Sequence, residues 1–115
     1  MSRLTTHLLD LFHGRPAEGV RLRLFRSETK ELLGEWRTDE TGRAICDPTG
    51  GKPLGPGRYD LVFTIGAYFA AAGVALADPP FLEEIVIRFG MGGTSVPYHI
   101  PLLVTPWSYT TYRGQ

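Results

Sequence analysis

The chain contains a single cysteine, Cys46, so no disulfide can form within it. A lone cysteine is compatible with a reducing compartment, where thiols stay reduced. No apolar run approaches the roughly 20 residues that a membrane-spanning helix needs. Thr5, Thr6, His7 and Asp10 interrupt the N-terminal segment, where a secretion signal would require a continuous apolar stretch. From these absences we expect a soluble, cytoplasmic protein.

An excess of charge is also missing, because 12 basic residues balance 12 acidic ones. This balance gives no electrostatic argument for nucleic acid or an anionic membrane as a partner. The HxH, HExxH and CxxC spacings of zinc sites are absent, so no metal is expected. The glycines at 50–51 and 90–93 lack the strand–helix context of a phosphate-binding loop. Cys46 has no basic neighbour to lower its pKa, which favours a packed thiol over a nucleophile.

The overall composition is that of an ordinary globular protein, and the chain is short. The chain has 115 residues, of which 43% are hydrophobic. This length leaves room for one domain, residues 1–115, and the apolar content argues against disorder.

Alternating polar and apolar residues dominate the chain. Val20, Leu22 and Leu24 alternate with Arg21 and Arg23, which is the period of a half-buried strand. Strands are predicted over Leu4–Leu11, Val20–Phe25, Glu31–Thr38, Arg43–Cys46, Arg58–Ile65, Glu84–Phe89, Tyr98–Val104 and Ser108–Arg113.

The alanine-rich segment 67–75 is the one predicted helix. The turn at 39–42 is tight, 47–57 is a loop, and the glycines of 90–93 are expected to form a flexible segment. About eight short strands with frequent turns and no alternating helices predict an all-β fold, a two-sheet β-sandwich.

The C-terminal segment, residues 98–115, is unusually aromatic for a chain end. Because exposed aromatic surface favours aggregation, we expect Trp107, Tyr109 and Tyr112 to be buried in their own domain or against another subunit. The segment is either a final edge strand or part of a polar site.

Histidine and arginine are the best candidates for chemistry. A neutral histidine accepts a proton near pH 7, and a guanidinium holds a carbonyl or anion at two points. His7 and His99 both lie in predicted strands, and Arg43 follows the tight turn. His13 lies in a Gly-Pro turn and is expected to be solvated. From the residues alone, a structural, hydrogen-bonded role for His7 and His99 is favoured over a catalytic one.

Several segments together closely resemble the transthyretin-related protein family, in particular its 5-hydroxyisourate hydrolases. The resemblance covers essentially the whole chain. It is carried by residues 4–10, 14–17, 38–43, 69–70, 78–82, 98–103, 106–109 and 112–114.

The resemblance implies a prealbumin-like (transthyretin-like) sandwich and a homotetramer, a dimer of dimers with sites at the dimer–dimer interface. It implies a cofactor-free hydrolase of urate (purine) degradation that opens 5-hydroxyisourate to 2-oxo-4-hydroxy-4-carboxy-5-ureidoimidazoline. By the same resemblance, His7, Arg43 and His99 are catalytic, while His7, Arg43 and Tyr112 contact the substrate.

Arg113 and Gln115 are further candidates from the C-terminal motif. The family motif ends in serine where this chain has Gln115, and Pro97 stands where the family often has histidine. Two alternatives stay open: a transthyretin-like carrier of small ligands, and a catalytically weakened homologue.

Overall fold

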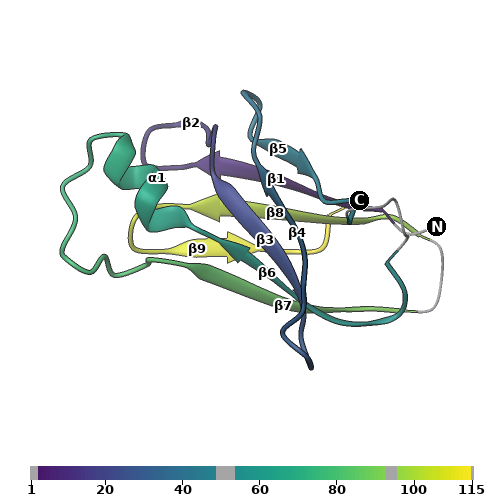
Figure 1. Ribbon diagram of the computed structural model, residues 1–115. Helices are drawn as coiled ribbons and strands as arrows, with labels where there is room; N and C mark the ends of the chain where they lie inside the picture. Colours follow the sequence, from purple (N-terminus) through teal and green to yellow (C-terminus); the bar gives the residue numbers. More distant parts are fainter. Residues whose placement is uncertain (1–2, 49–53, 93–95, 115) are drawn as a thin grey trace.

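The computed structural model describes residues 3–48, 54–92 and 96–114 and shows two packed β-sheets with one short helix (Figure 1). This arrangement confirms the predicted two-sheet sandwich. The five-stranded sheet has the order β2 (Arg15–Pro16), β1 (Leu4–Asp10), β8 (Tyr98–Val104), β9 (Tyr109–Thr111), with β5 (Arg43–Ile45) also paired to β1. The four-stranded sheet has the order β4 (Leu32–Arg37), β3 (Arg21–Arg26), β6 (Gly57–Phe63), β7 (Ile85–Met91).

The core lies between the two sheets and follows the alternation of the strands. In β1, Leu4, Thr6 and Leu8 are buried while the residues between them are partly exposed. Successive side chains of a strand point to opposite faces, so the β1 residues that alternate with these buried ones point away from the core. The largest fully buried side chains are Tyr59, Phe63, Phe69, Leu4, Leu8, Leu22, Leu24, Leu61, Ile65, Ile85, Leu102 and Val20.

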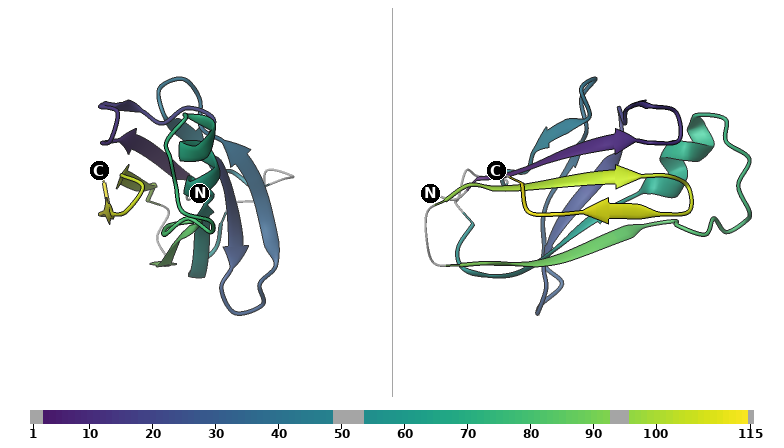
Figure 2. Two further views of the ribbon diagram at one scale, coloured as in Figure 1. Left: turned by 90° about the vertical axis from the view of Figure 1, so that its left-hand side faces the viewer. Right: turned by 180° about the vertical axis from the view of Figure 1, so that it is seen from behind.

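Helix α1 (Ile65–Ala71) lies across one end of the sheets (Figure 2) and begins two residues before its predicted start. Ile65 and Phe69 are buried and attach it to the core. It ends early because Gly73 takes a positive φ of 86°, and the Gly73 and Val74 amides close the last turn. No helix in the described part of the chain is long and apolar enough to cross a membrane.

Strand β7 also differs from the prediction. It continues through Gly90 and Met91, which were expected to belong to a flexible glycine segment. Gly90 pairs with Arg58 and Met91 pairs with Gly57, so backbone pairing with β6 holds this part of the segment in the sheet. Residues 93–95 lie outside the described residues.

A buried carboxylate connects the end of β1 to α1. Asp10 is fully buried, and its Oδ1 accepts hydrogen bonds from the amides of Phe12 and His13, both at 2.9 Å. Its Oδ2 accepts from His13 Nδ1 at 2.6 Å and from the Tyr68 hydroxyl at 2.8 Å. The His13 ring also stacks on Phe69. His13 is exposed, as expected, but its ring is not free, because the buried Asp10 carboxylate and Phe69 hold it.

The Asp10 network predicts an acid-sensitive stability. Burial by itself raises the pKa of Asp10, but the hydrogen bonds from His13 and Tyr68 outweigh it and lower the pKa below its ordinary value. A carboxyl with a depressed folded pKa stabilises the fold above its unfolded pKa, and this contribution is lost as the pH falls below about 4. We expect Asp10→Asn to lower the free energy of unfolding at pH 7 by about 1–3 kcal/mol, and to flatten its decrease toward pH 3.

Urea unfolding between pH 7 and pH 3 measures both effects. Asp47→Asn is the control, because within the described residues the one ion pair of Asp47 is an exposed one with Arg3 at 3.4 Å. Equal behaviour of the two variants at every pH would contradict the assigned role of Asp10.

Candidate active site

Strand pairing brings three of the predicted site residues to one face of the five-stranded sheet. His7 of β1 is directly opposite Arg43 of the antiparallel β5. Thr5, two residues earlier on the same outward face, is opposite His99 of the parallel β8. Paired residues share a face, so His7, Arg43 and His99 form a cluster outside the core, which we call the histidine face.

The turn between β4 and β5 places Arg43. Oδ1 of Asp39 accepts three hydrogen bonds: from the Thr41 amide at 2.8 Å, the Thr41 hydroxyl at 2.6 Å and the Arg43 amide at 3.1 Å. These bonds lower the pKa of Asp39. Gly42 has a φ of 81°, and a Cβ there would overlap the carbonyl oxygen of Leu8. The turn is therefore closed by Asp39 and packed directly on β1.

The same turn fixes the tautomer of His7. Its Nε2 lies 2.9 Å from the carbonyl oxygen of Thr41. Because a carbonyl oxygen only accepts hydrogen bonds, Nε2 carries a proton. In the neutral ring, Nδ1 then holds the free lone pair.

His99 is held in its neutral form. Its Nδ1 lies 2.8 Å from the hydroxyl oxygen of Thr5. Burial lowers the pKa of His99, and the nearby His7 and Arg43 lower it further. Among the described residues, its Nε2 makes no hydrogen bond. A neutral imidazole with a free nitrogen beside a guanidinium can take a proton from water.

The C-terminal segment returns to this strand after β9. His99 and Gly114 form an isolated antiparallel bridge in which the Gly114 amide donates to the His99 carbonyl at 2.7 Å. The guanidinium of Arg113 lies 4.2 Å from the centre of the Tyr98 ring. Tyr98 is an inward residue of β8, so Arg113 is not part of the histidine face. Gln115 lies outside the described residues.

The aromatic side chains of the C-terminal segment are exposed in the single chain. Trp107 is 55% exposed, Tyr109 44% and Tyr112 60%. The expectation that they are buried within their own domain is therefore wrong. Tyr112 borders a cleft of about 260 Å³ between β7 and the C-terminal segment, where Ile87, Phe89 and Ile100 also lie.

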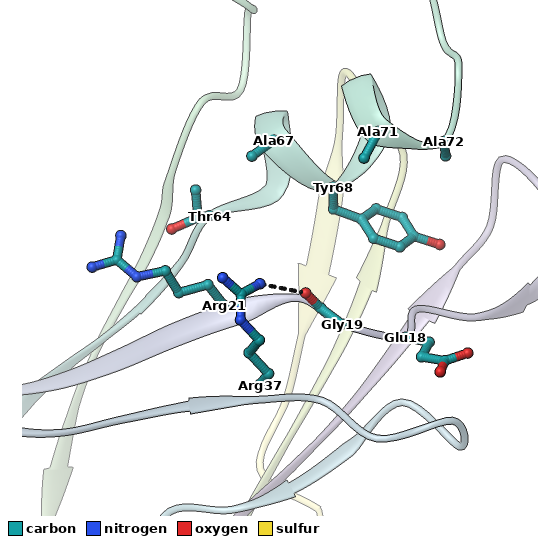
Figure 3. A pocket seen from close by; sticks show the side chains of 9 residues that line it. All are labelled: Glu18, Gly19, Arg21, Arg37, Thr64, Ala67, Tyr68, Ala71 and Ala72. Carbon is teal, nitrogen blue, oxygen red and sulfur yellow. Dashed lines mark hydrogen bonds between the residues drawn. The ribbon is translucent and has the colours of Figure 1, made fainter.

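A separate groove lies on the other sheet, and none of the predicted site residues lines it. It measures about 570 Å³ and lies between α1 and the start of β3 (Figure 3). Arg21, Arg37 and Tyr68 border it, and Arg37 donates to the carbonyl oxygen of Gly19 at 3.0 Å. Arg21 is already engaged by Glu35 at 2.8 Å. Both arginines of the groove already make hydrogen bonds, and the residues that line the groove include no histidine that could act as a base.

The single cysteine is a packed thiol, as predicted. Cys46 is fully buried, and burial together with the nearby Asp47 raises the pKa of its thiol to about 12. A thiol with this pKa supplies no thiolate near neutral pH. Cys46 is therefore excluded as a nucleophile.

The sequence prediction missed the residues that hold the histidine face in place. Asp39 was noted only as part of a turn, although Asx-type hydrogen bonds are a frequent reason for Asp at this position. Thr5 and the Thr41 carbonyl could not be identified, because their partners lie 94 and 34 positions away in the sequence.

The hydrogen bonds of the Asp39 turn lead to a prediction about one atom, the Oδ1 oxygen of Asp39. All three side-chain bonds end on Oδ1, so an asparagine with its carbonyl oxygen in that position keeps them. We expect Asp39→Ala to lower the free energy of unfolding, and Asp39→Asn to lower it clearly less. Denaturant unfolding at pH 7 measures both variants. Equal losses would show that the Asp39 charge, rather than its hydrogen bonds, closes the turn.

Comparisons with known proteins add an independent line of evidence. The profile described as "HIUase/Transthyretin family" matches residues 4–114. The chain is 45% identical to the 5-hydroxyisourate hydrolase of Pseudomonas aeruginosa, over 99% of this chain and 92% of that protein. It is 47% identical to the 5-hydroxyisourate hydrolase of Caulobacter vibrioides, over 99% of both chains.

Solved structures agree with these matches. The 5-hydroxyisourate hydrolase of Klebsiella pneumoniae superimposes with a TM-score of 0.83 at 37% identity and 100% coverage of both chains. A structure of (S)-allantoin synthase gives a TM-score of 0.87 at 43% identity over 99% of this chain, which spans 44% of that longer protein. The strands that carry His7, Arg43 and His99 all lie within the matched residues.

Proposed function

The chain belongs to the HIUase/Transthyretin family, and from this premise we propose that it hydrolyses 5-hydroxyisourate on the histidine face, with His7, Arg43 and His99 as catalytic residues. The support for this activity is the similarity to curated 5-hydroxyisourate hydrolases of nearly equal length, which are 45% and 47% identical to this chain. The observation that carries the site is the strand register that brings His7, Arg43 and His99 to one face of the sheet, where burial lowers the pKa of His99. Residues 1–115 act as one domain and need no cofactor.

His99 is the general base in this proposal. Its lowered pKa favours the neutral imidazole at pH 7, and in this scheme Nδ1–H donates to the Thr5 hydroxyl, which leaves Nε2 to accept a proton. Water attacks the ring carbonyl next to N1 of the substrate while His99 takes one of its protons. The new C–O bond forms, the C–N1 bond breaks, and the proton passes to the leaving nitrogen. General acid–base assistance of this kind contributes roughly 10²–10⁴-fold to the rate.

Arg43 and His7 complete the site. Arg43 holds the carbonyl edge and stabilises the negative charge that develops on oxygen, a contribution of about 10²–10³-fold for one donor. His7 Nε2–H is committed to the Thr41 carbonyl, so its Nδ1 orients the attacking water. Tyr112, which is 60% exposed in the C-terminal segment, is the proposed contact to the substrate ring, although within one chain it borders the cleft beside β7 and not the histidine face.

The assembly in this proposal is a homotetramer, a dimer of dimers that functions in the cytoplasm in urate (purine) degradation. The support is physical: the exposed Trp107, Tyr109 and Tyr112 require cover, and the histidine face is an open sheet surface in one chain. A second chain placed over this face would exclude water and form a concave site. Closed symmetric assemblies of this kind are the common outcome for soluble oligomers.

The histidine substitutions test the site directly. We expect His99→Asn and His7→Asn each to lower turnover of 5-hydroxyisourate by at least about 10²-fold, because each removes a proton-transfer or water-binding nitrogen. The assay follows the loss of the substrate's ultraviolet signal against its spontaneous decay. His13→Asn is the matched control, since His13 belongs to the Asp10 network and not to the histidine face. Wild-type rates in both site variants would mean that these histidines are structural.

Oligomeric state tests the assembly. We expect light scattering at micromolar concentration to give the mass of four 12.7 kDa chains. A monomer mass in active protein would show that one chain supplies the whole site.

A further inference from the structure

Gly114 lies closer to the His99 ring than any other residue type would allow. A Cβ at Gly114 would be 2.6 Å from Cδ2 and 3.3 Å from Cγ of the imidazole, and 3.2 Å from Cγ of Pro101. Carbon atoms in van der Waals contact are about 3.5–4.0 Å apart. The backbone of Gly114 therefore occupies space beside the imidazole that a side chain cannot share.

Backbone conformation is not the reason for glycine at this position. Gly14, Gly19, Gly42, Gly57 and Gly73 are the described glycines with a positive φ, and Gly114 is not among them. Its torsions are open to other residues. Only the close approach to His99 and Pro101 requires a missing Cβ.

The His99 ring is held from two sides. Thr5 lies 2.8 Å from Nδ1 on the β1 side. On the other side, Gly114 covers Cδ2, the ring carbon bonded to Nε2, and its amide bond to the His99 carbonyl at 2.7 Å keeps the segment in place. The ring is thus fixed at the edge that carries the free nitrogen.

We propose that Gly114 is a positioning residue for the hydrolysis: its missing Cβ allows the C-terminal segment to pack against the imidazole of His99 and to hold the ring in its reactive orientation. This inference rests on the proposed function, because His99 is the base only in that scheme. It gives the glycine of the C-terminal motif a role that is separate from substrate contact.

The charged and titratable groups around His99 make the role measurable. His7 faces it from β1 and Arg43 from β5. In the C-terminal segment, Arg113 is turned toward Tyr98. Burial is the largest cause of the lowered pKa of His99. Moving the segment away hydrates the ring, so the pKa of His99 rises toward its ordinary value.

The experiment compares Gly114→Ala with Gly55→Ala, a control because a Cβ at Gly55 meets nothing within 4 Å. We expect Gly114→Ala to lower kcat by roughly 10–100-fold with a smaller change in KM, because displacement of a reacting group by about 1 Å costs up to 10²-fold. An NMR titration of His99 is expected to show a higher pKa in Gly114→Ala and an unchanged pKa in Gly55→Ala. An unchanged His99 pKa together with an unchanged kcat would overturn the proposal.

If the Gly114→Ala variant folds poorly, a double-mutant cycle on the free energy of unfolding tests the same contact. His99→Ala removes the ring atoms that the new Cβ would meet, so Gly114→Ala should cost less unfolding free energy in that background than in the wild type. Additive costs would contradict the contact. The NMR titration and the double-mutant cycle need no substrate, so they test this proposal independently of the hydrolase assignment. Failure of the hydrolase assignment would instead appear as an inactive wild-type protein.

Discussion

The pairing of β1 with both β5 and β8 is the constraint on which the histidine face depends. β1 brings His7 opposite Arg43 on one side and Thr5 opposite His99 on the other. The buried Leu4, Thr6 and Leu8 fix the register, because a slip by one residue would turn His7 into the core. The packing of the sandwich and the chemistry of the site are therefore set by the same alternation.

A second consequence of this arrangement is that neighbouring residues orient each group of the histidine face. Asp39 closes the turn that carries Arg43, and the Thr41 carbonyl in that turn fixes the proton on His7. Thr5 and Gly114 hold His99. Each catalytic group is oriented by a neighbour that makes no contact with substrate in the proposed scheme. Such support is what keeps a site within the small tolerance that proton transfer needs.

The strands were predictable because their alternation is local, as in Val20–Phe25. The helix start was placed at residue 67, where the alanine-rich run begins, whereas α1 begins at Ile65. In the structure Gly66 lies inside α1, where a Cβ would be 3.0 Å from Pro80 Cγ and 3.2 Å from Glu83 Cα. Gly90 was misjudged for a related reason, since its pairing partner Arg58 is distant in the sequence. Local composition cannot reveal a glycine that is required by packing.

The residues of the candidate site could be proposed from the sequence, but their geometry could not. His7, Arg43 and His99 followed from a family resemblance, whereas their residue types alone favoured a structural role for the histidines and a surface position for the arginine. The proton on His7 Nε2 and the contact of Gly114 with His99 depend on segments that only the fold brings together. The exposure of Trp107 and Tyr112 was likewise not predicted from the sequence.

The central claim is that His99 is the neutral base of a 5-hydroxyisourate hydrolase. Its most direct test is the pH dependence of kcat/KM for the wild-type protein, measured beside an NMR titration of His99. The account predicts an acid limb whose pKa matches that of His99, with both below the ordinary value of about 6.5. A His99 pKa at or above that value, or an acid limb that does not follow it, would contradict the account.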